Sequence, residues 1–329
     1  MPTTTPILAS RYNTLRDNVN LVLGNSIAAS PSYGYGQAFS TSSVVGSRAA
    51  NDIANADKIS AQDYEDLYID LIRTRSHQIG TSVAIDEFVI GDYETNPETV
   101  DKIEEAYILG LESLAADIIT DRLTVAPANL TIETLPSVSS TRPAGFNWTS
   151  QISHIFRITF TTSQERRHFF NTGGEIRFSA SVDYTGSQAK TVDWQTILNA
   201  MGSTSFKAEQ TVNNAGVGSG SNIGNYDLTS SYRLIYSRTG GSVYARNRYN
   251  VYAREYATGD STSAIQFKVD FVDGAPNDTQ YGIDELVFGT FNSIIESATA
   301  NSQIDINGVT HDAVVFDSSI SGALIRALS

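Results

Sequence analysis

Apolar residues recur at two different periods along this chain, and the change of period near residue 125 is the feature that most limits its fold. Before that point they are spaced three and four apart, as between Tyr12 and Val22, which is the spacing of one face of an α-helix. Beyond it they alternate with polar residues, as between Ile176 and Tyr184, which is typical of strands with one buried face. We therefore predict an α+β protein, with an N-terminal helical region followed by an antiparallel, sandwich-like β-rich domain that carries one packed helix.

Three helices are predicted in the first part, over residues 9–23, 60–78 and 96–118. Ser60 can cap the second helix in a capping box with Asp63, and Gly80 stops it. The third begins at Asn96 and Pro97, an amide cap followed by a proline in the first turn, and one apolar stripe continues along its whole length. Its acidic residues lie mostly off that stripe, as a solvated face or as a docking face for a basic partner or a second subunit.

Alternation in the second part predicts strands near residues 156–160, 176–184, 232–236, 249–253 and 265–271. Asn307-Gly308 predicts a two-residue hairpin turn, and a helix near 191–201 ends at Gly202. The Pro, Ser and Thr residues between these parts indicate a connection. We accordingly expect a helical, acidic docking and assembly region at 1–125, a linker at 126–145 and a β-rich domain at 146–329.

The acidity of the chain belongs mainly to its first part. The formal net charge of the whole chain is −14, and residues 1–125 hold 18 acidic and 8 basic side chains. Duplex binding depends on Lys and Arg neutralising phosphates, so we expect no direct nucleic-acid partner. No run of 18 apolar residues and no basic-then-apolar start occurs, so we expect no membrane insertion and no signal peptide. Cysteine is absent, which excludes disulfides and thiolate sites.

Three motifs follow one another along the chain. Residues 71–80 read LIRTRSHQIG, residues 166–181 read RRHFFNTGGEIRFSAS and residues 190–202 read KTVDWQTILNAMG. In this order they resemble a family of virion structural proteins of tailed bacteriophages, best represented in phages of cyanobacteria and other aquatic bacteria. The resemblance covers most of the chain, implies a structural role in the particle and supplies no catalytic residues.

The residues of these motifs also predict packing. We expect Phe169 and Phe170 to bring aromatic bulk into a turn, and Gly173-Gly174 to lead through a tight hairpin into the strand that follows. Trp194 and Met201 are expected to cover a sheet face, with Val192, Ile197 and Leu198 on the same side of their helix.

Other residues that could carry chemistry lack a pattern that names a reaction. The histidines are His77, His154, His168 and His311, and none has metal-ligand spacing to another ligand. The glycines between Gly216 and Gly220 lack the Lys and the following helix of a phosphate loop, which favours a mobile surface loop. Asp273, Asp278, Asp284 and Glu285 surround a turn and leave open a weak calcium site or a hydrolase pair. Residues 244–256 alternate arginines and tyrosines, which favours stacking and interface contacts.

The sequence therefore favours a non-enzymatic virion component of the neck, tail, baseplate or fibre apparatus. We expect it to be assembled in the host cytoplasm, to bind other virion structural proteins and further copies of itself as a homo-oligomer, and to need no cofactor or metal. The candidate interface residues, chosen as Tyr and Arg, are Tyr33, Tyr35, Tyr64, Tyr107, Arg246 and Tyr252. The alternatives are a receptor- or glycan-binding module of the tail or fibre, and a hydrolase of host envelope polymers.

Overall fold

The chain divides into two compact units. The computed structural model describes residues 9–25, 32–33, 59–81, 83, 104–135, 138–142, 151–160, 163–258, 261–275, 287–300, 303–306, 309–312 and 321–328. The first unit, here the helical unit, comprises Met1–Thr131, Asn171–Gly173 and Ala300–Asp317. The second, the β unit, comprises Ile132–Phe170, Gly174–Thr299 and Ser318–Ser329.

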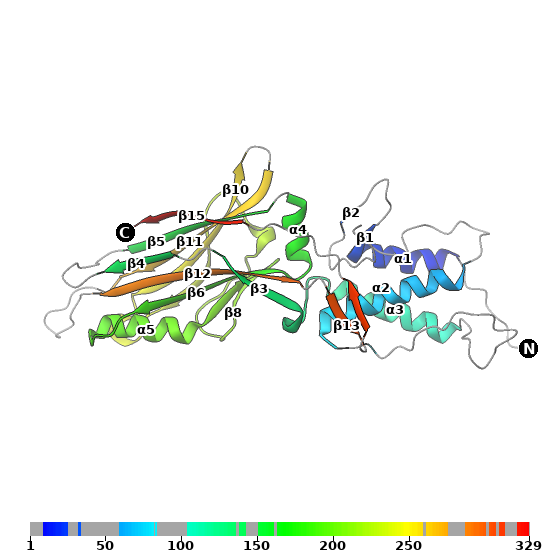
Figure 1. The fold of residues 1–329 in the computed structure, drawn as a ribbon, viewed down its shortest axis with the longest axis horizontal. Helices are drawn as coiled ribbons and strands as arrows, with labels where there is room; N and C mark the ends of the chain where they lie inside the picture. Colours follow the sequence, from blue (N-terminus) through cyan, green and yellow to red (C-terminus); the bar gives the residue numbers. More distant parts are fainter. Residues whose placement is uncertain are drawn as a thin grey trace, which may run out of the picture. The chain divides into compact units, whose positions relative to one another are not determined.

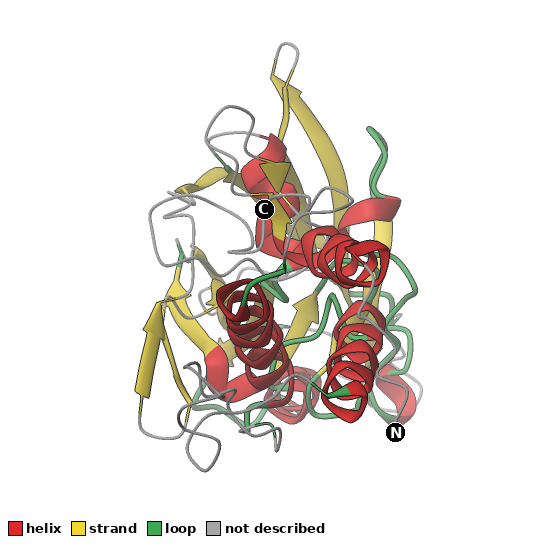
Figure 2. Ribbon diagram, turned by 90° about the vertical axis from the view of Figure 1, so that its right-hand side faces the viewer, coloured by secondary structure: helices red, strands yellow, loops and turns green. Residues whose placement is uncertain are grey.

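Three packed helices form the centre of the helical unit. They are α1 (Ala9–Leu23), α2 (Ala61–Ile79) and α3 (Glu105–Thr120), and Figure 2 views them roughly end-on. Their apolar stripes meet in one core that includes Leu15, Leu67 and Leu111. Two short antiparallel pairs complete this unit, β1 (Gly24–Asn25) with β2 (Ser32–Tyr33) and β13 (Gln303–Ile306) with β14 (Val309–Asp312).

The ends of α2 follow the sequence prediction. The Ser60 amide N–H donates to an Asp63 carboxylate oxygen at 2.7 Å, and the Asp63 amide donates back to the Ser60 hydroxyl at 3.3 Å, which makes a capping box. At the other end Gly80 has φ of +76° and its N–H donates to the Ser76 carbonyl at 2.8 Å. The predicted range of α1 and the hairpin strands around Asn307-Gly308 are also confirmed, while those two turn residues lie outside the described residues.

The predicted start of the third helix is wrong. Glu104 is extended, with φ of −108° and ψ of 159°, and α3 begins at Glu105. The expected start at Asn96-Pro97 lies outside the described residues, but one continuous helix across Glu104 is excluded. Acidic side chains at Glu104 and Glu105 favour a helix start at this point because the N-terminal end of a helix carries partial positive charge. The spacing of the apolar residues, on which the prediction is based, does not reflect this charge effect.

Two antiparallel sheets pack face to face in the β unit (Figure 1). One has the strand order β15-β5-β11-β10-β9 and the other β3-β12-β6-β7-β8, with β4 also paired to β12. The first contains β5 (Gln151–Thr159), β9 (Arg233–Thr239), β10 (Arg248–Thr258), β11 (Ser261–Val272) and β15 (Ser321–Leu328). The second contains β3 (Leu130–Thr134), β4 (Val138–Arg142), β6 (Glu175–Asp183), β7 (Ser203–Phe206), β8 (Thr211–Asn213) and β12 (Gly289–Ala300). The stretch 126–145, expected to be a linker, therefore contributes two strands.

Aromatic rings fill the space between the two sheets. Phe178 of β6 and Phe267 of β11 have ring centroids 4.8 Å apart, and Phe271 of β11 and Phe291 of β12 are 5.1 Å apart. The predicted helix is α5 (Ala189–Met201), and its Trp194 makes edge contacts with both Phe271 and Phe291. Trp194 is buried as expected, but Val192 is 40% exposed, so its assignment to the buried side of α5 is wrong.

Phe169 and Phe170 lie in a helix, α4 (Ser163–Asn171), and not in a turn. Both rings are buried against Phe160. Gly173 and Gly174 then form a helix-to-strand turn instead of a hairpin: the Gly174 N–H donates to the Phe169 carbonyl at 2.9 Å. The sequence prediction missed α4 because its polar residues form no apolar stripe, and tertiary contacts of the two rings stabilise it instead.

Candidate functional site

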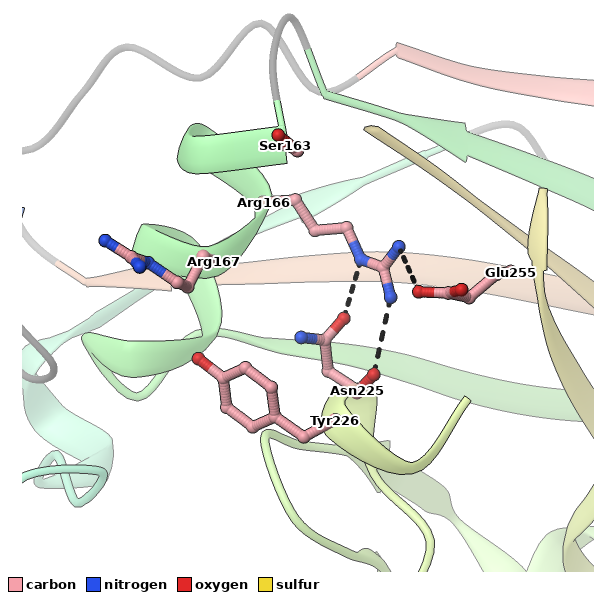
Figure 3. Close-up of a pocket in the computed structure, with 6 residues that line it drawn as sticks. All are labelled: Ser163, Arg166, Arg167, Asn225, Tyr226 and Glu255. Carbon is pink, nitrogen blue, oxygen red and sulfur yellow. Dashed lines mark hydrogen bonds and ion pairs between the residues drawn. The ribbon is translucent and has the colours of Figure 1, made fainter. Parts of the chain in front are cut away.

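A pocket of about 190 Å³ lies beside α4 in the β unit (Figure 3). Its walls come from α4, from the short 3-10 helix η2 (Asn225–Asp227) and from β10. The lining residues are Ser163, Arg166, Arg167, Asn225, Tyr226 and Glu255. Two guanidinium groups and one carboxylate give the pocket a positive balance, which suits a small anionic group such as a carboxylate.

Arg166 connects all three walls of this pocket. Its Nε donates to the Asn225 side-chain oxygen at 2.7 Å, its NH2 donates to the Asn225 carbonyl at 3.3 Å, and its NH1 lies 3.3 Å from Glu255. Burial lowers the pKa of Arg166, and the charge of Glu255 acts in the opposite direction. Because the Arg166 guanidinium is already engaged on three sides, its main effect is to brace α4 against η2 and β10.

A second candidate site is the outer face of the five-stranded sheet, the face that points away from β6 and β12 (Figure 1). In β10 and β11 the residues opposite the buried positions alternate onto this face, and cross-strand partners such as Tyr252 and Lys268 stand side by side. We call the following set the tyrosine–cation face: Arg157, Tyr232, Arg248, Tyr252, Arg254, Tyr256 and Lys268.

Cations and rings alternate across the tyrosine–cation face. The Arg157 guanidinium carbon lies 3.8 Å from the Tyr256 ring centroid, and that of Arg254 lies 4.6 Å from Tyr232 and 5.9 Å from Tyr256. The Lys268 ammonium lies 4.4 Å from Tyr252 and 5.6 Å from Tyr232. All these separations fall within the roughly 6 Å range of cation–π attraction, so the contacts link β5, β10 and β11 with the residue that precedes β9.

Hydrogen bonds hold these side chains in place. The Gln266 side-chain oxygen accepts from Tyr232 Oη at 3.0 Å and from Arg254 Nε at 2.8 Å. Asp270 accepts from Ser153 Oγ at 2.6 Å and lies 2.7 Å from the Lys268 ammonium. Gln266 and Asp270 are both buried, so the cations are fixed from below and their outer surfaces stay available.

The two sheets differ in charge. The five strands of the sheet that carries the tyrosine–cation face hold seven basic and two acidic residues, a net of +5. The strands of the other sheet hold two basic and four acidic residues, a net of −2. Within a chain of net charge −14, the first sheet is therefore a local concentration of positive charge.

The predicted interface residues fall in different environments. Tyr252 belongs to the tyrosine–cation face, and Arg246 is exposed in the turn before β10. Tyr64 is buried in the helical core, edge-on to Tyr12 at 5.4 Å, and is therefore a core residue. Tyr107 packs partly buried against the same core. Tyr33 lies in β2, with no described side chain, and Tyr35 lies outside the described residues.

Sequence reasoning missed most of the tyrosine–cation face as a unit. The basic and aromatic stretch at 244–256 was visible, but only its alternate members point outward, and Tyr249 is fully buried. Strand parity could have separated Tyr252 and Arg254 from Tyr249. Arg157 and Lys268 come from other strands, and only the register, Arg157 opposite Gln266 opposite Arg254, brings them together.

Among the remaining chemical candidates, those that the structure describes make contacts within the fold. The Asp273 side chain is 3% exposed and lies 2.8 Å from the Lys190 ammonium, while Asp278, Asp284 and Glu285 lie outside the described residues. A search of the described residues finds no group of three or more metal-ligating side chains. The glycine loop is attached to β9, because Tyr236 Oη donates to the Val217 carbonyl at 3.0 Å.

Two histidines have described side chains and both are buried. His77, in the last turn of α2, has its pKa lowered to about 4 by burial and is neutral near pH 7. His154 Nδ1 lies 2.9 Å from Ser293 Oγ in the β unit. His168 and His311 have no described side chains.

Comparisons with known proteins give no relative: no family model, no curated protein and no solved structure matches the chain. Among the described helices, none combines the length and the apolar character that a bilayer span requires.

Proposed function

We propose that this protein is a structural component of a tailed-bacteriophage virion, from the neck, tail, baseplate or fibre apparatus, and that it acts by binding other particle proteins. The observation that carries the proposal is the tyrosine–cation face. Tyr and Arg dominate binding energy at protein interfaces, and here Tyr232, Arg254 and Tyr252 are held in place by contacts within the sheet. Side chains ordered before association cost less entropy when a partner binds.

The motifs that resemble the virion family support the same role. They fall on α2, on α4 with β6, and on α5. Their largest side chains, Phe169, Phe170 and Trp194, are buried. Motifs that specify a core are what a scaffold for protein–protein contacts requires.

Glycan binding is the alternative function that the tyrosines of this face suggest. Sugars stack on aromatic ring faces that are free of other groups, whereas cations already lie over the rings of Tyr232, Tyr252 and Tyr256. A glycan would have to displace Arg254 or Lys268, which are held by Gln266 and Asp270. The geometry therefore favours a protein partner.

Quantitative mass spectrometry of gradient-purified phage particles, from a lysate of cells in which the chain is expressed, tests the proposal. We expect its peptides at a fixed ratio to the major capsid protein across successive purification steps. A ratio that falls toward zero with purification would refute a structural role. A glycan array probed with the folded protein separates the alternative: specific binding that is lost on Tyr252→Ala would favour receptor recognition.

A further inference from the structure

We propose that the tyrosine–cation face binds the acidic outer surface of α3 from a second copy of this chain. The inference rests on the proposed assembly function and names the partner. According to this inference, each copy carries both surfaces of one contact, a positive sheet face and a negative helix. Copies would therefore associate head to tail.

The first observation is charge complementarity. The outer face of the sheet carries Arg157, Arg248, Arg254 and Lys268, with buried Asp270 as their described acidic neighbour on that face. By contrast, residues 1–125 hold 18 acidic against 8 basic residues. Opposite potentials of this kind steer two surfaces together and fix their register.

The second observation is the outer surface of α3. Glu105, Leu109 and Asp117 lie on its exposed side at intervals of four and eight residues, and Leu109 is 51% exposed. The helix contains three acidic residues and no basic one. Arg11 of α1 offsets part of this charge, because it lies 2.8 Å from Glu105 and 2.5 Å from Glu112. An apolar residue flanked by carboxylates is the counterpart of tyrosines flanked by cations.

The apolar parts of the two surfaces also match. Leu234 of β9 stands opposite Tyr252 in the sheet and is 44% exposed. Leu234, beside Tyr252, therefore offers an exposed apolar side chain near Lys268, against which a side chain such as Leu109 can pack. Such a contact places apolar area at the centre of the interface and charge at its rim, as in most protein interfaces.

The length of α3 agrees with the width of the five-stranded sheet. The 16 residues of α3 make a helix about 24 Å long at about 1.5 Å per residue. The five strands of the sheet span about 19 Å from first to last, at about 4.8 Å between neighbours. One such helix can therefore cross the whole sheet and reach Arg157 near one side and Arg248 or Arg254 near the other.

A contact between unlike surfaces leaves a free face on one copy and a free helix on the next. Repetition of that contact closes into a ring when the rotation between copies allows it, and otherwise extends into a filament. Both outcomes suit a component that surrounds the axis of a particle.

Two variants and their mixture test the inference. The face variant carries Arg157→Glu and Arg248→Glu, which leave the bonds of Gln266 intact; the helix variant carries Leu109→Gln and Asp117→Arg. The matched control carries Ile132→Gln and Glu133→Arg on exposed positions of β3. Circular dichroism and tryptophan fluorescence verify that each is folded.

Light scattering after size exclusion and sedimentation velocity then report association. We expect wild type to associate with rising concentration, less so at high salt, and the control to match it. Each variant alone should need a concentration at least tenfold higher than wild type to reach the same degree of association. An equimolar mixture should form a heterodimer, because the intact helix of the face variant meets the intact face of the helix variant.

Three results would overturn the inference: a wild-type chain that stays monomeric, variants that associate as wild type does, or a mixture that forms no heterodimer. Binding of a fluorescent single-stranded oligonucleotide that is lost only in the face variant, with self-association unchanged, would also overturn it and assign the face to nucleic acid. A monomeric chain that is nevertheless present in purified particles would refute this inference and leave the proposed function standing. Self-association of a chain that is absent from purified particles would refute the proposed function and leave this inference standing.

Discussion

Lys190 and Asp273 form a deeply buried ion pair in the β unit, and removing one member should be costly. The two side chains are 1% and 3% exposed, their charged atoms are 2.8 Å apart, and the Lys190 ammonium also donates to the Ala275 carbonyl at 3.2 Å. Lys190→Met keeps most of the side-chain volume but removes the ammonium group that lies against the buried Asp273 carboxylate. Breaking a buried pair in this way costs about 3–5 kcal/mol.

Tryptophan fluorescence during urea unfolding measures this loss in the β unit alone, because both tryptophans, Trp148 and Trp194, belong to that unit. A loss of about 3–5 kcal/mol corresponds to a fall of roughly 10 °C in the melting temperature of a unit of this size. Lys207→Met is the matched control, since Lys207 is 43% exposed and lies 3.9 Å from Glu175. We expect that variant to lose no more than about 0.5 kcal/mol.

The double variant Lys190→Met with Asp273→Leu distinguishes loss of the pair from loss of packing. Replacing both members of a buried pair by apolar residues is often neutral, so the double variant should regain most of the stability that the single variant loses. The reasoning would be refuted if Lys190→Met cost less than about 1 kcal/mol, or if the two lysine variants were equally destabilised. The result also bears on function, because an Asp273 that serves mainly to neutralise Lys190 is a structural residue and not a calcium ligand or a catalytic acid.

Three further predictions concern His77, a pair of glycines and Ser60. The buried, neutral His77 has a pKa of about 4, so the free energy of unfolding of the helical unit should fall by roughly 3 kcal/mol as the pH drops from about 6.5 to about 4. In circular dichroism melts, His77→Gln should lose this pH dependence. An unchanged pH dependence would contradict its assignment to His77. Gly174→Ala would bring a Cβ within 2.4 Å of the Phe169 carbonyl, whereas a Cβ at Gly110 of α3 meets nothing within 4 Å. The first should destabilise by about 1–3 kcal/mol and the second stabilise by roughly 0.5–1 kcal/mol in urea melts, and effects of the same sign would be contrary evidence. Ser60→Ala should lower the free energy of unfolding by about 1 kcal/mol in the same assay, because the helix cap is lost. An unchanged free energy would show that the capping box does not stabilise the fold.

The sequence was most informative where a local rule and the tertiary fold agree. Ser60 and Asp63 mark a helix start within four residues, and Ile176 to Val182 alternate along one strand whose buried face meets the other sheet. Both signals depend on neighbours in the chain. They required no knowledge of what the segment packs against.

The failures came from contacts made at long range. Helix α4 has a polar sequence and is held by the rings of Phe169 and Phe170 against Phe160. Lys190 lies in a helix whose sequence gives no sign of a buried charge, because its partner Asp273 is 83 residues away. The tyrosine–cation face depends in the same way on the register of β5, β11 and β10.

Asp270 supports the proposal that this face binds a partner. It lies in the central strand of its sheet, is 2% exposed and accepts a hydrogen bond from Ser153 at 2.6 Å while it holds Lys268 at 2.7 Å. A buried carboxylate costs free energy unless its bonds repay the lost hydration, and an apolar residue at this position would cover the sheet without that cost. What the carboxylate does provide is a fixed position for the Lys268 ammonium beside the Tyr252 ring. A fold gains little from a surface lysine held in this way, whereas a surface that binds an acidic partner gains a charge that is already in position.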